Sequence, residues 1–149
     1  MGFKGWQTPP EFFAALHAEF AFTLDAAASH DNALLDRYFT EEMDGLAQSW
    51  MGERVFCNPP YDASLYAWVR KASLREAAVT VMLLPASVDT AWFHDFIWCV
   101  PDAYPCNALG CENARARVDV RFLRGRLRFW RDGKPGGAPR AGNMIVVWR

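Results

Sequence analysis

Long apolar runs are absent from this 149-residue sequence: none approaches the roughly 18 residues that cross a membrane as a helix. The N-terminal stretch also lacks the apolar core of a secretory signal peptide. We therefore expect a cytoplasmic protein with no membrane contact. The length suffices for one domain with its own core, which we place over residues 1–149, and we expect a monomer or a weak dimer.

The sequence also lacks the C-x-x-C pairs that are typical of structural zinc sites. Its four cysteines are Cys57, Cys99, Cys106 and Cys111. One alternative is a zinc site made by the last three with His94. Buried free thiols in a reducing compartment are the interpretation we favour, and we expect no metal.

Charge is close to balanced overall but unevenly distributed along the chain. Residues 1–112 carry 6 basic and 15 acidic side chains, whereas residues 113–149 carry 10 basic and 2 acidic ones. Nine of those ten basic residues are arginines, which suit the binding of phosphate groups. The pattern favours a nucleic-acid surface in the C-terminal quarter. The alternative is a solvated sheet face that pairs with the acidic part of the chain.

A short apolar run, Val55–Cys57, predicts the end of a buried strand that leads directly into Asn58-Pro59-Pro60-Tyr61. The two prolines cannot donate to a sheet, so the strand ends there, and they also restrict the residues that precede them. The result is a stiff loop at the C-terminal end of a strand, which is where ligands bind in open α/β sheets.

This Asn-Pro-Pro-Tyr loop resembles the motif of the S-adenosylmethionine-dependent amino-methyltransferases. The resemblance implies that the Asn58 side-chain oxygen and the Pro59 carbonyl accept both hydrogens of a target amine, while Tyr61 stacks on the base. Pro60 completes the motif. A turn between a strand and a helix is the alternative, and the motif does not distinguish adenine in DNA from adenine in RNA or from a protein glutamine.

Near the N-terminus, Thr8 and Glu11 have the spacing of a capping box, with Pro9 at the first position of the predicted helix. The string Trp6-x-Thr8-Pro9 is also similar to one in the Dam-like, phage-type DNA N6-adenine methyltransferases. In that family it lines the cofactor pocket, so the resemblance implies cofactor contacts for Trp6, Thr8 and Pro9.

Two further segments resemble cofactor motifs of the same family. Leu24–Ala27 contains the end of a predicted short strand, Phe22–Asp25, and the first small residues after it. The resemblance implies that Asp25 contacts the methionine amino group, with Ala26 and Ala27 close to the cofactor. Asp44, in an Asp-Gly-Leu segment, is implied to lie beside it. The glycine-rich G-x-G loop of many methyltransferases is missing. Asp25 as a helix cap and Asp44 as an exposed turn residue are the alternatives.

The middle of the chain predicts one βαβ unit: strand Val55–Cys57, helix Asp62–Glu76 and strand Val79–Leu84. The last strand is almost continuously apolar, which is typical of a parallel strand covered on both faces. An aromatic stripe over residues 92–98 is expected to be core. We expect contacts with the target in the irregular segment Pro101–Asn113.

The C-terminal part predicts three more strands. Val118–Leu123 and Arg126–Trp130 alternate apolar and polar residues, and Asn143–Trp148 is apolar. Gly125–Phe129 before a Gly/Pro-rich turn also resembles the phage-type family. The arginine-rich strands and the turn provide the predicted DNA-binding residues: Arg124, Arg126, Arg128, Arg131 and Lys134.

These segments occur in the order of the family along nearly the whole chain. The resemblance implies an α/β, Rossmann-like S-adenosylmethionine-dependent methyltransferase fold, with a mostly parallel sheet and an antiparallel C-terminal strand pair. It implies methyl transfer from S-adenosyl-L-methionine to N6 of adenine in double-stranded DNA. Methylation of RNA adenine or protein glutamine, and a catalytically silent nucleic-acid-binding module, are the alternatives.

Overall fold

The structure, a computed structural model, describes residues 6–98, 118–137 and 139–149. Within these ranges three helices and seven strands follow one another along the chain. They are α1 (Pro10–Phe20), β1 (Leu24–Asp25), β2 (Arg54–Cys57), α2 (Leu65–Ser73), β3 (Val79–Pro85), α3 (Ala91–Phe96), β4 (Val118–Phe122), β5 (Trp130–Arg131), β6 (Lys134–Pro135) and β7 (Asn143–Trp148).

Five of these strands form a central sheet in the order β1-β2-β3-β7-β4. β1, β2 and β3 pair in parallel, whereas β7 pairs antiparallel with both β3 and β4. β4 therefore runs in the same direction as the first three strands, and β7 alone runs against them. This arrangement confirms the predicted α/β fold with a mostly parallel sheet and an antiparallel pair from the C-terminal part.

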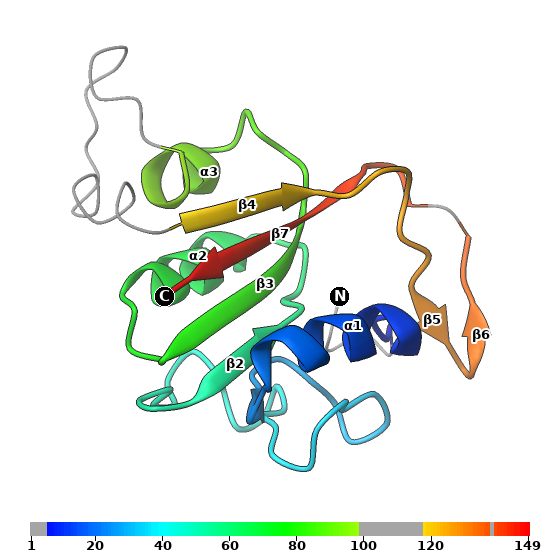
Figure 1. Cartoon of the computed structure of the whole chain (residues 1–149), viewed down its shortest axis with the longest axis horizontal. Helices are drawn as coiled ribbons and strands as arrows, with labels where there is room; N and C mark the ends of the chain where they lie inside the picture. Colours follow the sequence, from blue (N-terminus) through cyan, green and yellow to red (C-terminus); the bar gives the residue numbers. More distant parts are fainter. Residues whose placement is uncertain (1–5, 99–117, 138) are drawn as a thin grey trace.

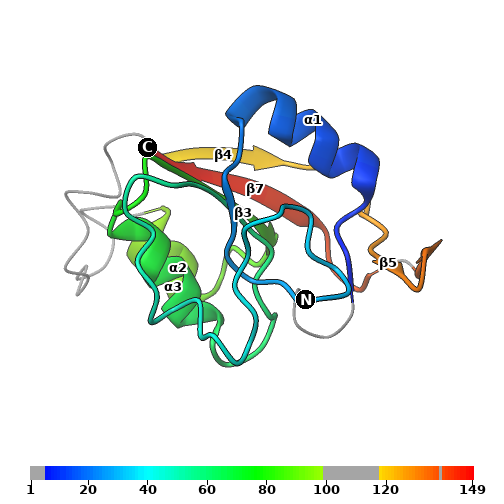
Figure 2. The ribbon, with the colours of Figure 1, turned by 90° about the horizontal axis from the view of Figure 1, so that it is seen from below.

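Helices cover both faces of the sheet. Figures 1 and 2 show α1 on one face and α2 with α3 on the other. Along β3, Val79, Val81 and Leu83 pack in the cluster on the α1 side, and Met82 and Leu84 pack in the cluster on the opposite side. Burial of each such side chain contributes roughly 1.5–3 kcal/mol. The expectation of a strand covered on both faces is confirmed.

The predicted βαβ unit is present as β2, α2 and β3, but its helix is shorter than expected. The helix covers Leu65–Ser73 rather than Asp62–Glu76. Asp62 does not cap it directly, because its Oδ1 accepts the Ser64 N–H at 2.8 Å and forms a turn that precedes the helix. This turn separates the Asn-Pro-Pro-Tyr loop from the helix.

The aromatic stripe on α3 is core, as predicted. Trp92, Phe93, Phe96 and Ile97 are buried in the cluster that also holds α2. Trp98, at the end of the stripe, is 57% exposed. Cys57 is fully buried with a free thiol, in agreement with the expectation for this cysteine.

The predicted strand Arg126–Trp130 is wrong. Residues 123–129 are irregular, and only Trp130–Arg131 forms a strand, β5, which pairs with β6 outside the main sheet. The chain turns at Gly125, which has φ +76°. Both edges of β7 are already occupied, by β3 and β4, so the alternating segment finds no place beside the terminal strand.

The predicted capping box at the first helix is also wrong. α1 begins at Pro10, and Pro9 is the N-cap residue, without a side-chain hydrogen bond to the helix. The Thr8 hydroxyl is directed elsewhere: it accepts a hydrogen bond from the Asn58 side-chain amide. The local spacing assigned the Thr8 hydroxyl to a helix cap, but this hydroxyl bonds to Asn58, which is 50 positions away in the sequence.

Candidate active site

The chain leaves β1 and β2 at the same edge of the sheet. The two strands pair in parallel with Asp25 opposite Phe56, and the Ala26 N–H donates to the Phe56 carbonyl at 2.9 Å. The segment after β1 and the loop that starts at Asn58 therefore emerge side by side. Ligands bind at such carboxyl ends of strands in open α/β sheets.

A small pocket opens at this edge. Its lining joins three separate parts of the sequence: the segment before α1, the end of β1 with the turns after it, and the end of β2. The lining residues are Trp6, Gln7, Thr8, Asp25, Ala27, Asn32, Leu34, Phe56 and Asn58.

Five of the lining residues are sequence-predicted site residues: Trp6, Thr8, Asp25, Ala27 and Asn58. Sequence reasoning missed the other four. Gln7 occupies the variable position of the Trp-x-Thr-Pro string, and Phe56 is indistinguishable from an ordinary core residue of a strand. Asn32 and Leu34 lie in a segment without periodicity, so no local signal identified them.

Asp25 is a buried carboxyl group, 3% exposed. Burial raises its pKa to about 6, although hydrogen bonds from the Leu34 and Ala27 backbone N–H groups act in the opposite direction. The Leu34 N–H donates to Asp25 Oδ2 at 3.2 Å. Turns and bends rather than a helix follow Asp25, so its interpretation as a helix cap is wrong.

The backbone of Asp25 is held on both sides. On one side β1 pairs with β2. On the other side the Asp25 N–H donates to the Arg37 carbonyl and the Asp25 carbonyl accepts the Phe39 N–H, each at 3.0 Å. The carboxyl group therefore projects from a fixed backbone, which favours a defined ligand position.

Asn58 presents an acceptor without a partner. The side chain is 3% exposed, and its Nδ2 donates to Thr8 Oγ1 at 3.2 Å. Its Oδ1 is buried and has no hydrogen-bond partner among the described residues. A buried unsatisfied oxygen costs about 1–3 kcal/mol, so its retention in a pocket points to a ligand that donates to it.

The remaining residues of the loop lie outside the lining of this pocket. Pro59 and Pro60 are buried, and Tyr61 is half-buried. The Tyr61 hydroxyl donates to the Leu83 carbonyl at 2.9 Å and accepts from Asn143 Nδ2 at 3.2 Å. Burial raises the pKa of Tyr61 well above its ordinary value, so the phenol stays neutral and acts as an anchor.

Asn143, which sequence reasoning missed, joins this loop to the terminal strand. Its Nδ2 donates to Tyr61 and to the Leu84 carbonyl, while its buried Oδ1 has no partner among the described residues. The Tyr61 ring also meets the edge of the Phe129 ring, with centroids 6.3 Å apart. Residues from β3, from β7 and from the chain just before β5 thus orient Tyr61.

Asp44 lies in an exposed turn and does not line the pocket. It has φ +52°, and its Oδ1 accepts the Leu46 N–H at 3.2 Å. The next residue, Gly45, packs so closely on the chain after β1 that an added Cβ would overlap the Ala26 carbonyl oxygen. The turn therefore borders the predicted cofactor segment, although the Asp44 carboxylate faces solvent.

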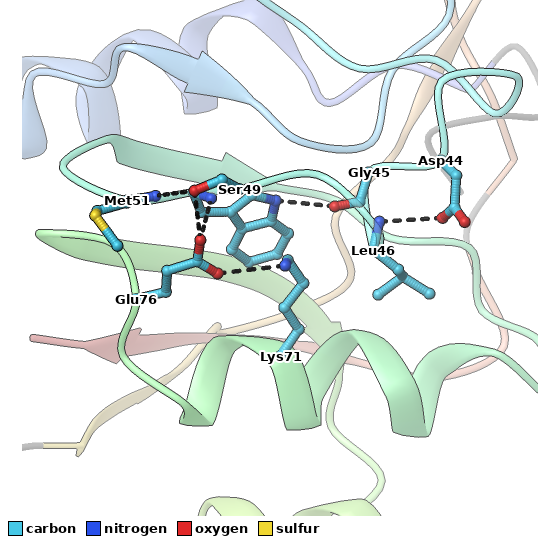
Figure 3. Close-up of polar contacts among 8 residues, drawn as sticks. Asp44, Gly45, Leu46, Ser49, Met51, Lys71 and Glu76 are labelled. Atoms are coloured by element: carbon cyan, nitrogen blue, oxygen red, sulfur yellow. Dashed lines mark hydrogen bonds and ion pairs between the residues drawn. The ribbon is translucent and has the colours of Figure 1, made fainter.

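The Glu76 carboxylate connects Ser49 and Trp50, which follow this turn, to Lys71 on α2 (Figure 3). Glu76 accepts hydrogen bonds from Ser49 Oγ at 2.6 Å, the Trp50 N–H at 2.8 Å and Lys71 Nζ at 3.4 Å. The Ser49 hydrogen bond is the main reason why the pKa of Glu76 is lowered. Buried Trp50 in turn donates its Nε1–H to the Gly45 carbonyl at 3.0 Å, which anchors the turn.

The predicted DNA-binding residues are exposed and lie in the part of the chain from the residues after β4 to the first residue of β6. They are Arg124, Arg126, Arg128, Arg131 and Lys134. None forms an ion pair with another residue of the described ranges. Arg121 differs, because its guanidinium pairs with Glu19 and Asp119. Arg121 therefore fits the alternative to a nucleic-acid surface, in which a basic residue pairs with the acidic part of the chain, here with Glu19.

The β5–β6 hairpin contacts the residues before α1 that line the pocket. Gln7 and Trp130 exchange two backbone hydrogen bonds, at 2.7 and 2.8 Å. The Arg131 guanidinium lies 5.5 Å from the Trp6 ring centroid, and a Cβ on Gly136 would come within 2.5 Å of that ring. The basic hairpin and the pocket wall at Trp6–Thr8 are therefore in direct contact.

Comparison with known proteins identifies the family. The family model described as DNA N-6-adenine-methyltransferase (Dam) matches residues 4–149. The chain belongs to this family. The resemblance inferred from the sequence motifs is thereby confirmed for the Dam family.

One curated Dam relative is the DNA N-6-adenine-methyltransferase of Escherichia phage T1. It is 31% identical over 157 aligned residues, which cover 97% of this chain and 62% of the phage protein. The chain thus spans about three fifths of the length of the relative that it matches.

Some expectations fall outside the described residues of this Dam-family chain. They are the target contacts in Pro101–Asn113 and the zinc alternative with Cys99, Cys106 and Cys111. In the part of the chain that the structure describes, no group of three or more His, Cys, Asp or Glu side chains is arranged to hold a metal ion. No helix there is long and apolar enough to cross a membrane.

Proposed function

We propose that this chain transfers a methyl group from S-adenosyl-L-methionine to the exocyclic N6 of adenine in double-stranded DNA. The observation that carries the proposal is the buried Asn58 Oδ1, which has no hydrogen-bond partner among the described residues, on a side chain that lines the same pocket as Asp25. Membership of the Dam family supports the same reaction. The proposed target, adenine N6, is an amine, and Asn58 Oδ1 can accept one of its hydrogens.

The lining of the pocket fits part of this cofactor. Ionised Asp25 is costly in a buried site, and a cationic group such as the ammonium of the methionine moiety would offset that cost. Trp6 offers an aromatic surface, Thr8 a hydroxyl group, and Ala27 a small side chain that permits close approach. We place Pro9, Ala26 and Asp44 at the border of the same site. When bound, S-adenosylmethionine supplies a methyl group that is already activated as a sulfonium.

The residues of the loop act by position. Asn58 Oδ1 and the Pro59 carbonyl accept the two N–H hydrogens of the adenine amine, which directs the nitrogen lone pair away from both acceptors. Proline suits this role because its φ is restricted. Pro60 continues the rigid turn. Tyr61, with its hydroxyl anchored, presents its ring for stacking on the base, worth roughly 1–3 kcal/mol.

The basic hairpin and the segment before it would bind the DNA backbone. A target base must leave the double helix to reach a pocket of this kind, which costs a few kcal/mol. Contacts of phosphates with exposed guanidinium groups that form no ion pair with a described residue offset this cost. We assign this role to Arg124, Arg126, Arg128, Arg131 and Lys134.

The test compares Asn58→Ala with the wild type. Loss of one acceptor that acts in the transition state should lower turnover on duplex DNA by roughly 100- to 1,000-fold. The dissociation constant for S-adenosylmethionine should change by less than about threefold, because Asn58 serves the target amine. Gln48→Ala, which removes an amide outside the pocket lining, is the matched control and should keep wild-type turnover. Turnover of Asn58→Ala close to that of the wild type would contradict the proposal.

A further inference from the structure

We propose that Thr8 is a positioning residue for the Asn58 side-chain amide, and that Thr8 fixes the orientation of this amide together with a bound cofactor, which accepts the Thr8 hydroxyl hydrogen. The inference rests on the proposed function, since it concerns the acceptor for the target amine. Its starting point is the hydrogen bond between Asn58 Nδ2 and Thr8 Oγ1, at 3.2 Å, between residues that are 50 positions apart.

The orientation of this amide decides what the pocket can bind. An asparagine amide has an oxygen acceptor on one side and two N–H donors on the other. In the observed orientation Nδ2 faces Thr8, and Oδ1 is left without a described partner. A rotation by 180° would place the N–H donors where Oδ1 now lies. The pocket would then offer a donor to an amine that itself must donate.

Thr8 alone does not decide between these orientations. A hydroxyl has one hydrogen and two lone pairs, so it can accept from Asn58 Nδ2 or donate to Asn58 Oδ1. In the first arrangement its hydrogen remains available for another acceptor. Thr8 and Asn58 line the same pocket, so an acceptor group of a bound cofactor can take that hydrogen. Thr8 is then committed as an acceptor toward Asn58, and Oδ1 faces the target.

The position of Thr8 is well defined. The hydroxyl-bearing residue is 2% exposed, and both of its neighbours in the chain are constrained. Gln7 is paired with Trp130 through two backbone hydrogen bonds, and Pro9 has φ −53° at the start of α1. Thr8 therefore acts as a rigid reference for Asn58 rather than as a side chain that follows it.

The experiment compares Thr8→Val, which keeps the shape but removes the hydroxyl, with Thr8→Ser, which keeps the hydroxyl. Loss of one or two orienting hydrogen bonds should lower kcat of Thr8→Val by roughly 5- to 30-fold. The KM for duplex DNA should change by less than about threefold, because phosphate contacts dominate DNA affinity. Thr8→Ser should retain kcat within about threefold of the wild type. The melting temperature of each variant verifies that it is folded.

A second readout does not require turnover. In NMR spectra, the Asn58 Nδ2 hydrogen that is donated to Thr8 should exchange with solvent more slowly in the wild type and in Thr8→Ser than in Thr8→Val. Addition of S-adenosylhomocysteine, the cofactor without its methyl group, should slow this exchange further in the first two proteins only. The apo spectra test the contact even if the proposed methyl transfer fails, so the two failures are distinguishable.

Three results would overturn the inference. One is a kcat of Thr8→Val equal to that of the wild type. Another is a loss of kcat that Thr8→Ser does not restore, which would indicate a role of the threonine methyl group in packing. The third is equal exchange of the Asn58 side-chain amide in the wild type and in Thr8→Val.

Discussion

Replacement of Asp25 by asparagine should stabilise the cofactor-free protein at neutral pH. Asp25 is 3% exposed, and burial raises the pKa of its carboxyl group from the ordinary value of 3.8 to about 6. Asparagine has almost the same shape, and its amide oxygen can still accept the Leu34 N–H, although the amide nitrogen cannot accept the Ala27 N–H as a second carboxyl oxygen does. The variant therefore removes the cost of a buried negative charge while it retains the local packing.

The magnitude follows from the two pKa values. The folded pKa lies above the unfolded one, so below about pH 4 the carboxyl is protonated in both states and costs nothing. Between pH 3.8 and about 6 the unfolded chain releases its proton while the folded chain retains it, and stability falls as pH rises. Above pH 6 the full cost is about 3 kcal/mol, at about 1.36 kcal/mol per pH unit. Asp25→Asn removes this cost, which for a chain of this length should raise the melting temperature by roughly 6–12 °C.

Urea denaturation of the wild type and Asp25→Asn measures this difference. The gain in the free energy of unfolding should be about 3 kcal/mol at pH 7.5 and roughly half as large at pH 5. Asp36→Asn, at an exposed position, is the control and should change stability by less than about 0.5 kcal/mol. A gain that is the same at both pH values, or a loss, would refute the reasoning. Asp25→Asn should also bind S-adenosylmethionine more weakly, because a neutral amide does not pair with an ammonium group.

Two further predictions concern packing and DNA binding. Gly45→Ala should destabilise the fold by about 1–3 kcal/mol, since its Cβ would overlap a backbone oxygen, whereas Gly137→Ala has open space and should be neutral in the same thermal melts. The pair Arg126→Ala and Arg128→Ala should reduce the slope of log K against log salt by about 2, measured by fluorescence anisotropy with duplex DNA. Arg37→Ala, in which the lost guanidinium was paired with Glu53, is the control, and equal slopes would contradict the assigned surface.

Continuous apolar runs made the centre of the fold predictable. The strands at Val55–Cys57 and Val79–Leu84 follow from such runs, because a parallel strand covered on both faces has almost no polar positions. The alternation over Arg126–Trp130 led to a wrong prediction, because it identifies a segment that could pair, while both edges of the terminal strand β7 are occupied by β3 and β4. Pairing depends on which edges other strands occupy, and that is a property of the whole fold.

The candidate site was predictable only where motifs cover it. Asp25 and Asn58 were identified from short strings of residues, and they lie in one pocket. Asn143 was missed because its hydrogen bond to Tyr61 connects residues 82 positions apart. Thr8 was assigned to a helix cap because local spacing carries no information on a partner 50 residues away. Contacts between distant segments are thus the part that sequence patterns left out.

The measurement that tests the account most directly is transfer of a labelled methyl group from S-adenosylmethionine to unmethylated duplex DNA, followed by identification of the nucleosides. The account predicts that the label appears in N6-methyladenine, and that Asn58→Ala reduces it by roughly 100-fold or more. Label in RNA or protein but not in DNA would contradict the proposed substrate. Failure of the protein to bind S-adenosylmethionine would contradict the proposed reaction itself.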